Sequence, residues 1–332
     1  MAAYRFCRSD DIGLLTDALN RCWSPYFPDE PAMTPATFKQ SIRDRQVWCS
    51  SCMVAFSGAD PIGVLIGAKR ASGTLIHRIA VHPDHRRQEH GRHLLTSLGS
   101  KLAILGPPRI VAEVPETLDA ACGLFSASGY VEEAHLTDYV LSGEERDTDE
   151  RRTPNAERRI PKEKALFVDD PGAGEIAAVV QSAEADRYVI PVTVDDLTAN
   201  GLLEEGNPQT CWKRSVETLI ARKEHVAGLA VASDERIEAY VLYERCGVDP
   251  ERGEARGQSS GAPDVEVVSL RSLIEDDGAC LRQLLDRLRG QGSWTLRFPK
   301  VHPAEFSPGF LETLGFRPAG RHLLYAAHAR SN

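Results

Sequence analysis

The sequence of 332 residues predicts an α/β chain built from two tandem domains. Three observations support this prediction. Strand-like and helix-like patterns follow one another in the same order in both halves of the chain. Pieces of the first half recur in the second half at nearly one offset. A polar, charged stretch at residues 142–164 separates the halves and is nearly free of apolar side chains. We therefore expect domains at residues 1–142 and 165–332, joined by a linker at residues 143–164.

The first half alternates between the two kinds of periodicity. Alternating apolar residues bounded by turn residues predict strands at residues 4–7, 53–56, 63–70, 75–82, 109–114 and 138–141. Helical spacing predicts helices at residues 12–23, 35–43, 91–105 and 118–128. Thr34 stands directly before the second of these helices and is expected to cap it. The second half repeats this order in weaker form.

The repeat is visible in the residues themselves. The piece that begins GLFSASGY at Gly123 recurs as GFLETLGF at Gly309, which is 186 positions later. The piece GRHLLTSL at Gly91 recurs as GACLRQLL at Gly278, which is 187 positions later. Since a glycine–aromatic pair after a helix is common, neither match would suffice alone. Two matches at nearly one offset indicate a duplicated domain.

The overall composition disfavours several classes of partner. The net charge of −9 disfavours a general binder of nucleic acid or anionic membranes, because such binders depend on clustered Lys and Arg. No apolar run reaches the length of about 18 residues that a membrane helix needs, and the start of the sequence has no signal-type apolar run. We expect a cytoplasmic protein with neither nucleic acid nor membrane as a partner. The eight scattered cysteines, including the single Cys49–Cys52 pair, indicate idle thiols, and no metal site is expected.

A basic turn between a strand and a helix is the strongest local signal. Residues 74–81 read TLIHRIAV, and alternation places Leu75, His77, Ile79 and Val81 on one face. A turn with the sequence DHRRQEHGR follows at residues 84–92 and leads directly into a leucine-rich helix. The first amides of a helix have no partner within it, and the helix dipole favours anions. The turn therefore suits a diphosphate, while the alternative is a solvated basic loop.

These residues resemble a known family. Residues 82–92 resemble the acyl-CoA signature of the GCN5-related N-acetyltransferases (GNAT), which is (Arg/Gln)-x-x-Gly-x-(Gly/Ala) after a strand that ends in Val-x-Pro. Phe125 and the pair Gly129-Tyr130 resemble the later helix of that family and its Gly-Phe ending. The resemblance covers about residues 4–141. It implies, for each copy, a mixed twisted sheet flanked by helices (α/β, or α+β), whose fourth and fifth strands splay apart around the cofactor.

The resemblance also implies a cofactor, a set of binding residues and a reaction. The cofactor is acetyl-CoA as the acyl donor, without a metal. Main-chain groups of the strand would pair with the pantetheine arm, and amides of the turn would hold the diphosphate. The expected binding residues are Ile79, Ala80, Val81, Arg86, Arg87, Gln88, Glu89, His90, Gly91 and Arg92. A substrate amine would attack the thioester directly, so the protein mainly positions the reactants and removes a proton.

Two positions depart from the family pattern. Glu89 stands where the signature has its first glycine, so it either points outward and weakens binding modestly or marks a domain that no longer binds CoA well. Phe125 stands where many members have a tyrosine that protonates the leaving thiolate, and phenylalanine cannot donate a proton. The candidate catalytic residues are Glu113, as a base or a solvent-facing strand residue, and His77, as a base or a structural histidine.

The second copy differs from the first at the turn. Glu275, Asp276 and Asp277 precede Gly278, in the region that matches the basic turn. These acids would cap the following helix and repel a diphosphate. We expect the second copy to keep the fold but to have lost the cofactor, and either to wall the substrate cleft or to take the place of a partner subunit.

The function predicted from these features is an N-acetyltransferase. It would transfer an acetyl group from acetyl-CoA to an amine of a small molecule or peptide, with the chemistry in the N-terminal domain of a monomer or homodimer. The alternative is a non-catalytic acyl-CoA-binding or scaffold protein, which Glu89 and Phe125 favour. A third possibility is an interaction module that keeps only the fold and binds no CoA.

Overall fold

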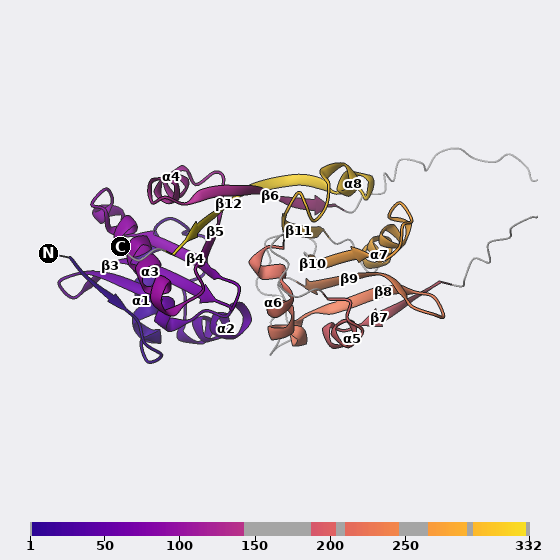
Figure 1. The fold of residues 1–332 in the computed structure, drawn as a ribbon, viewed down its shortest axis with the longest axis horizontal. Helices are drawn as coiled ribbons and strands as arrows, with labels where there is room; N and C mark the ends of the chain where they lie inside the picture. The colour runs from indigo at the N-terminus through magenta and orange to yellow at the C-terminus, as the bar shows by residue number, and fades with distance from the viewer. Residues whose placement is uncertain (1, 143–186, 204–209, 246–264, 291–294, 330–332) are drawn as a thin grey trace, which may run out of the picture.

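The computed structural model describes residues 2–142, 187–203, 210–245, 265–290 and 295–329. The expected linker at residues 143–164 lies outside the described residues, so the predicted domain limits stay a prediction. Within the described ranges, two halves of mixed α/β structure lie next to each other and share one sheet (Figure 1).

The first half contains the predicted elements in the predicted order. Its strands are β1 (Ala2–Phe6), β2 (Met53–Ser57), β3 (Asp60–Lys69), β4 (Thr74–Val81), β5 (Arg109–Pro115) and β6 (Val131–Leu141). Its helices are α1 (Ile12–Cys22), α2 (Pro35–Arg45), α3 (His90–Leu105) and α4 (Asp119–Ala127). The Thr34 hydroxyl accepts the amide of Thr37, as expected for the cap of α2. The largest difference is β6, which begins seven positions before the predicted residue 138.

The second half repeats this order with shorter helices. Its strands are β7 (Tyr188–Val192), β8 (Ala227–Ala232), β9 (Ile237–Arg245), β10 (Val265–Ser272), β11 (Leu296–Val301) and β12 (Arg317–His328). Its helices are α5 (Val194–Ala199), α6 (Val216–Ala221), α7 (Ala279–Arg289) and α8 (Pro308–Thr313), with a short 3₁₀ turn η3 (Trp212–Arg214) before α6. None of the helices in the described ranges is long and apolar enough to span a membrane.

The strands form one mixed sheet of twelve strands in the order β1-β2-β3-β4-β5-β12-β6-β11-β10-β9-β8-β7. Among the described strands, β4 with β5 and β10 with β11 are parallel pairs, and the other neighbours are antiparallel. Helices flank the sheet on both faces (Figure 1). The predicted fold class is therefore confirmed.

The two halves exchange their last strands. Strand β12 of the second half pairs with β5, and β6 of the first half pairs with β11. Apolar residues drive the exchange, because Leu323 and Tyr325 join a core cluster of the first half while Tyr139 and Leu141 join one of the second. The strands β6 and β12 pair with each other in the middle of the sheet.

A pseudo-twofold axis passes through this central pair of strands. Leu136 pairs with His322, and these residues lie 186 positions apart, which is the offset of the predicted repeat. Gly129 and Gly315, which are also 186 apart, both adopt positive φ angles of 80° and 87°. The halves are therefore equivalent in space as well as in sequence.

The predicted alternation along β4 is wrong beyond its middle. His77 has no partner in the ladder between β3 and β4, where the register shifts. As a result, Leu75 and Ala80 pack in the cluster on the α1 and α2 side, whereas Ile76 and Ile79 pack on the α3 side. The extra residue is a β-bulge, a feature that often lies next to active sites.

Candidate active site

The splay expected between the fourth and fifth strands is present. β4 and β5 pair only at Thr74 with Ile110 and at Leu75 with Val111, at the start of both strands. The later part of β4, with Ile79, Ala80 and Val81, lies beyond this parallel ladder. The Tyr26 hydroxyl donates to the Val81 carbonyl at 2.7 Å, so the segment after α1 reaches the end of β4.

The turn after β4 leads into α3 through unusual backbone angles. Arg87 and Glu89 have φ angles of 61° and 64°, in the left-handed region that favours glycine. Glu89 therefore adopts a conformation for which the family signature provides glycine. It makes no side-chain cap to α3, which leaves the first helix amides available to an anion. A Cβ on Gly91 would lie 3.0 Å from Leu124 Cδ2, so this glycine lets α3 approach α4.

The Glu89 side chain points into solvent. It is 70% exposed, and its carboxylate lies 2.7 Å from a guanidinium nitrogen of Arg92. Arg86, Arg87 and Gln88 are exposed as well. His90 is buried, and its Nδ1 lies 2.6 Å from the Tyr4 hydroxyl. The exposed basic groups thus surround the start of α3, and the carboxylate of Glu89 at this start is already paired with Arg92.

We expect Glu89→Gly to tighten acetyl-CoA binding by about two- to tenfold, because it removes a carboxylate next to the expected diphosphate. It should also stabilise the fold by about 1 kcal/mol by relieving the left-handed backbone. Titration calorimetry and urea unfolding measure these two effects. Glu89→Ala is the control that removes the charge but keeps the strain, so it should tighten binding without stabilising. Unchanged or weaker binding in Glu89→Gly would refute the prediction.

Glu113 faces the second half, and its carboxylate is engaged on both oxygens. Its side chain is 6% exposed, so it is not the solvent-facing residue of the alternative interpretation. Oε2 lies 2.9 Å from Lys300 Nζ, and Oε1 accepts the Trp212 amide at 2.8 Å. Burial alone would raise the pKa of Glu113, but Lys300 and the Trp212 amide together hold it below its usual value. The group is therefore an ionised carboxylate at the contact between the halves.

His77, at the bulge of β4, faces Arg45. Its Nε2 lies 3.1 Å from Arg45 Nη1, and since arginine can only donate, Nε2 accepts and the proton resides on Nδ1. Burial, followed by the charges of Arg45 and Arg78, lowers the pKa of His77 well below its usual value. The imidazole is therefore neutral, and its basic nitrogen is already occupied.

Trp212 of the second half is inserted into the core of the first half. It is 8% exposed and packs in the cluster formed around α1, α2 and β4. Its Nε1 donates to the Arg45 carbonyl at 3.0 Å. The Arg70 guanidinium lies 3.7 Å from the centre of the indole ring and bonds to Ser215 and Thr218 of the second half. Burial lowers the pKa of Arg70 to about 10.

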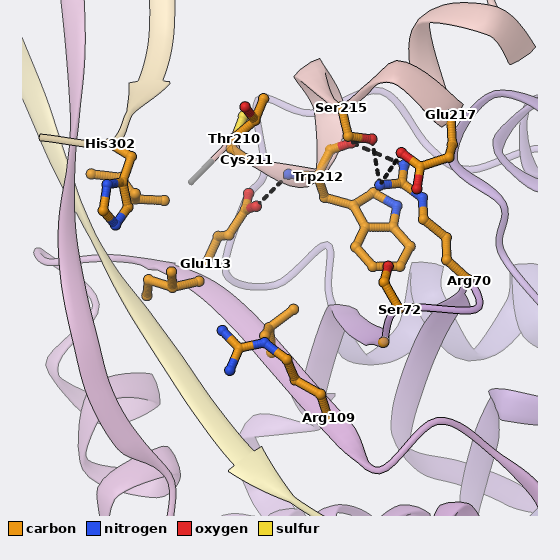
Figure 2. A pocket seen from close by; sticks show the side chains of 14 residues that line it. Arg70, Ser72, Arg109, Glu113, Thr210, Cys211, Trp212, Ser215, Glu217 and His302 are labelled. Atoms are coloured by element: carbon orange, nitrogen blue, oxygen red, sulfur yellow. Dashed lines mark hydrogen bonds and ion pairs between the residues drawn. The ribbon is translucent and has the colours of Figure 1, made fainter. Parts of the chain in front are cut away.

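A cavity of about 130 Å³ lies between the halves beside Glu113. Figure 2 shows Glu113 and Arg109 of β5 on one side, Cys211 and Trp212 opposite them, and His302 from the second half. Arg109 pairs with Glu133, and Glu113 with Lys300, so these two charged lining residues are already in ion pairs. The cavity can therefore admit a small uncharged group, such as a neutral amine, without leaving these charges unpaired.

A tyrosine of the exchanged strand β12 lies next to Phe125, the position where many family members have a tyrosine. Phe125 is 2% exposed and stacks on Tyr325 of β12 with ring centres 5.6 Å apart. The Tyr325 hydroxyl lies 3.4 Å from Ser126 Oγ. Tyr325 and Lys300 were missed from the sequence. The one available signal was the repeat, since Lys300 lies 187 positions after Glu113 and thus at the equivalent point of the second copy.

The second half keeps the splay but fills the anion position with its own acid. Among the described residues, β10 and β11 pair at only two positions, as β4 and β5 do. At the start of α7, the Asp276 carboxylate accepts the Gly278 amide at 3.0 Å and the Cys280 amide at 2.7 Å. When the starts of α3 and α7 are aligned, equivalent residues lie 189 positions apart. Gly278, rather than Asp276, is therefore the equivalent of Glu89. The predicted capping by an acid is present, and the capping residue is Asp276.

Comparison with known proteins agrees with this architecture. Residues 14–130 match the acetyltransferase (GNAT) family. A tandem GNAT protein from the clavulanic acid biosynthesis pathway has a similar fold, with a TM-score of 0.58 and 14% identity over 100% of both chains. A GCN5-related N-acetyltransferase from Sphaerobacter thermophilus aligns with a TM-score of 0.56 and 12% identity, over 99% of this chain and 96% of that one.

A putative acetyltransferase from Pyrococcus horikoshii is also similar, with a TM-score of 0.54 and 13% identity over 99% of this chain and 90% of that one. The match to the GNAT family thus covers residues 14–130, and the whole chain has a fold similar to that of a tandem GNAT protein. Among the described residues, no group of three or more His, Cys, Asp or Glu side chains is arranged to hold a metal ion.

Proposed function

We propose that the chain transfers an acetyl group from acetyl-CoA, bound by the first half, to an amine of a small molecule or peptide that enters between the halves. The observation that carries this proposal is the contrast between the two helix starts. The first amides of α3 follow a basic turn and have no side-chain acceptor, whereas Asp276 occupies those of α7. An anion is favoured at the first and repelled at the second.

The residues of the first half fit the cofactor. Amides at residues 87–92, with Arg86, Arg87 and Arg92 around them, would hold the diphosphate. Main-chain groups at Ile79–Val81 lie beyond the β4–β5 ladder and would bind the pantetheine amides as an added strand. Acetyl-CoA would supply the activated acyl group, and the chain would orient the thioester in the splay.

The proposed reaction is direct attack by a neutral amine. The C–N bond forms as the C–S bond breaks, the thiolate of CoA leaves, and the amine gives up one proton. Glu113 is the carboxylate at the cavity and our candidate to accept this proton. His77, the second candidate from the sequence, is not among the residues that line the cavity, and its Nε2 already faces Arg45. Lys300 and the Trp212 amide would have to loosen one contact for Glu113 to act. The second half supplies both of these contacts, which in a dimer could come from a partner subunit. We therefore favour a monomer as the active unit.

The rival function is a non-catalytic acyl-CoA-binding protein, which Phe125 and the fully engaged Glu113 favour. Release of free CoA thiol from acetyl-CoA, measured over a panel of small-molecule and peptide amines, separates the two. Amine-dependent release that Glu113→Gln reduces by about tenfold or more is the result we expect. Tight CoA binding without thiol release on any amine would favour the rival. The absence of CoA binding would favour an interaction module that keeps only the fold.

A further inference from the structure

The size of the cavity beside Glu113 limits what can enter between the halves. Its volume is about 130 Å³, which is the space of about four or five waters at about 30 Å³ each. An occupant of about five heavy atoms therefore fills it. Val111, Leu136 and Leu324 give the lining an apolar part against which a short alkyl chain can pack.

The charges at this cavity are balanced. Each of the four Arg and Glu side chains that line it has a partner of opposite charge. The pairs are Arg109 with Glu133, Arg70 with Glu217 at 3.8 Å, and Glu113 with Lys300 at 2.9 Å, so their charges sum to zero. A carboxylate, a phosphate or a second ammonium group on the occupant would have no counter-charge here. The cavity therefore favours an occupant that carries no charge besides its reacting amine.

His302 of the second half lines the same cavity and brings a neutral donor to it. Its Nδ1 accepts the Ala304 amide at 3.0 Å, so in the neutral ring the proton resides on Nε2. Burial lowers the pKa of His302 below its usual value, against the charges of Glu305 and Glu133, so the ring is neutral at pH 7. Figure 2 shows the imidazole on the side of the cavity away from Arg70 and Trp212.

The Nε2–H group of His302 is available to an occupant. Among the residues that the structure describes, Nε2 has no hydrogen-bond partner, and it is not fully enclosed by protein. A neutral imidazole N–H is matched by a neutral acceptor such as a hydroxyl oxygen. The hydroxyls of Ser72 and Thr210 also line the cavity, so its remaining polar groups are neutral as well.

We propose that the acetyl acceptor is a short amino alcohol, whose hydroxyl oxygen accepts from His302 Nε2 while its neutral amine faces Glu113. This inference names the substrate class of the acetyl transfer proposed above, and it rests on that function. The alkyl chain between the two groups packs against Val111, Leu136 and Leu324. The amine gives up one proton and the CoA thiolate takes up one, so the products are the N-acetylated alcohol and free CoA. His302 is then the residue that distinguishes a hydroxyl group from a methyl group.

Release of CoA thiol with three amines that have the same number of heavy atoms tests this inference. They are 3-aminopropan-1-ol, butan-1-amine and propane-1,3-diamine, compared at equal concentrations of neutral amine. The kcat/KM for the amino alcohol should exceed that for butan-1-amine by about two- to tenfold, the effect of one neutral hydrogen bond. It should exceed that for the diamine by about tenfold or more, because the second ammonium group has no counter-charge in the cavity.

Two substitutions at His302 test the donor itself. His302→Asn keeps an acceptor for the Ala304 amide but removes Nε2–H, so the amino alcohol should fall to the kcat/KM of butan-1-amine. His302→Gln carries an amide N–H in place of Nε2–H and should keep the preference for the amino alcohol. His135→Asn is the matched control, because His135 is 55% exposed on β6 and lies outside the cavity lining, so the preference should be unchanged.

The outcomes separate this inference from the function on which it rests. Equal kcat/KM for the amino alcohol and butan-1-amine, or a preference that survives His302→Asn, would overturn the inference and leave the acetyl transfer in place. Thiol release on other amines but not on the amino alcohol would do the same. The absence of release on any amine, with acetyl-CoA bound, would overturn the proposed function as well. If His302→Asn fails to fold, the comparison of the three amines with the unaltered chain decides.

Discussion

Replacing Trp212 with alanine should destabilise the protein by about 3–5 kcal/mol, the range for removing a large buried aromatic side chain. Trp212 is 8% exposed. Its indole packs in the core of the first half, although the residue belongs to the second half in sequence. The variant also loses the bond from Nε1 to the Arg45 carbonyl and the ring beneath the Arg70 guanidinium.

Urea unfolding followed by circular dichroism measures this effect. Trp48→Ala is the matched control, because Trp48 is 54% exposed and its loss should change stability by about 1 kcal/mol or less. A Trp212→Ala protein as stable as Trp48→Ala would show that the halves do not depend on this contact.

Replacing Lys300 with methionine should destabilise the protein by about 3–5 kcal/mol at neutral pH, because it leaves the Glu113 carboxylate buried without its counter-charge. Lys300 has a left-handed φ of 51°, and its amide donates to Asp138, so the backbone that presents the side chain should stay in place. Combining Lys300→Met with Glu113→Gln removes the unpaired charge and should recover most of the loss. A double variant no more stable than Lys300→Met would contradict this account.

The pH dependence of stability gives an independent signature of the same pair. In the unaltered protein the folded-state pKa of Glu113 is lowered, so its contribution is present above the ordinary glutamate pKa of about 4.3 and is lost as the pH falls through the lower folded value. In Lys300→Met the remaining burial raises that pKa, so stability should instead fall as the pH rises above about 4.3. Unfolding measured from pH 4 to pH 8 should therefore show no Glu113-dependent change in stability above about pH 4.3 in the unaltered protein, and a stability that falls with rising pH in Lys300→Met.

The local elements of the fold could be predicted because their signals are local. Thr34 caps α2, and the leucines of α3 lie at helical spacing, so neither depends on distant contacts. The strand exchange could not be predicted in this way. The choice of β12 rather than β6 as the neighbour of β5 depends on side chains such as Tyr325, which lie far away in sequence.

The candidate site was predictable in part for the same reason. The basic turn is contiguous in sequence, and the structure places it at the start of α3 as expected. The environment of Glu113 was not predictable, because Lys300 and Trp212 reach it only through the pairing of the two halves. The bulge at His77 also escaped prediction, since one unpaired residue reverses the faces of all later residues without changing the local sequence pattern.

Titration calorimetry with acetyl-CoA tests most directly whether the two halves have diverged into one that binds the cofactor and one that does not. We predict one acetyl-CoA per chain, with binding weakened about tenfold or more by Arg86→Ala and unchanged by Asp276→Asn. Two equivalents per chain, or a single equivalent that is insensitive to Arg86→Ala but altered by Asp276→Asn, would contradict the assignment of the cofactor to the first half.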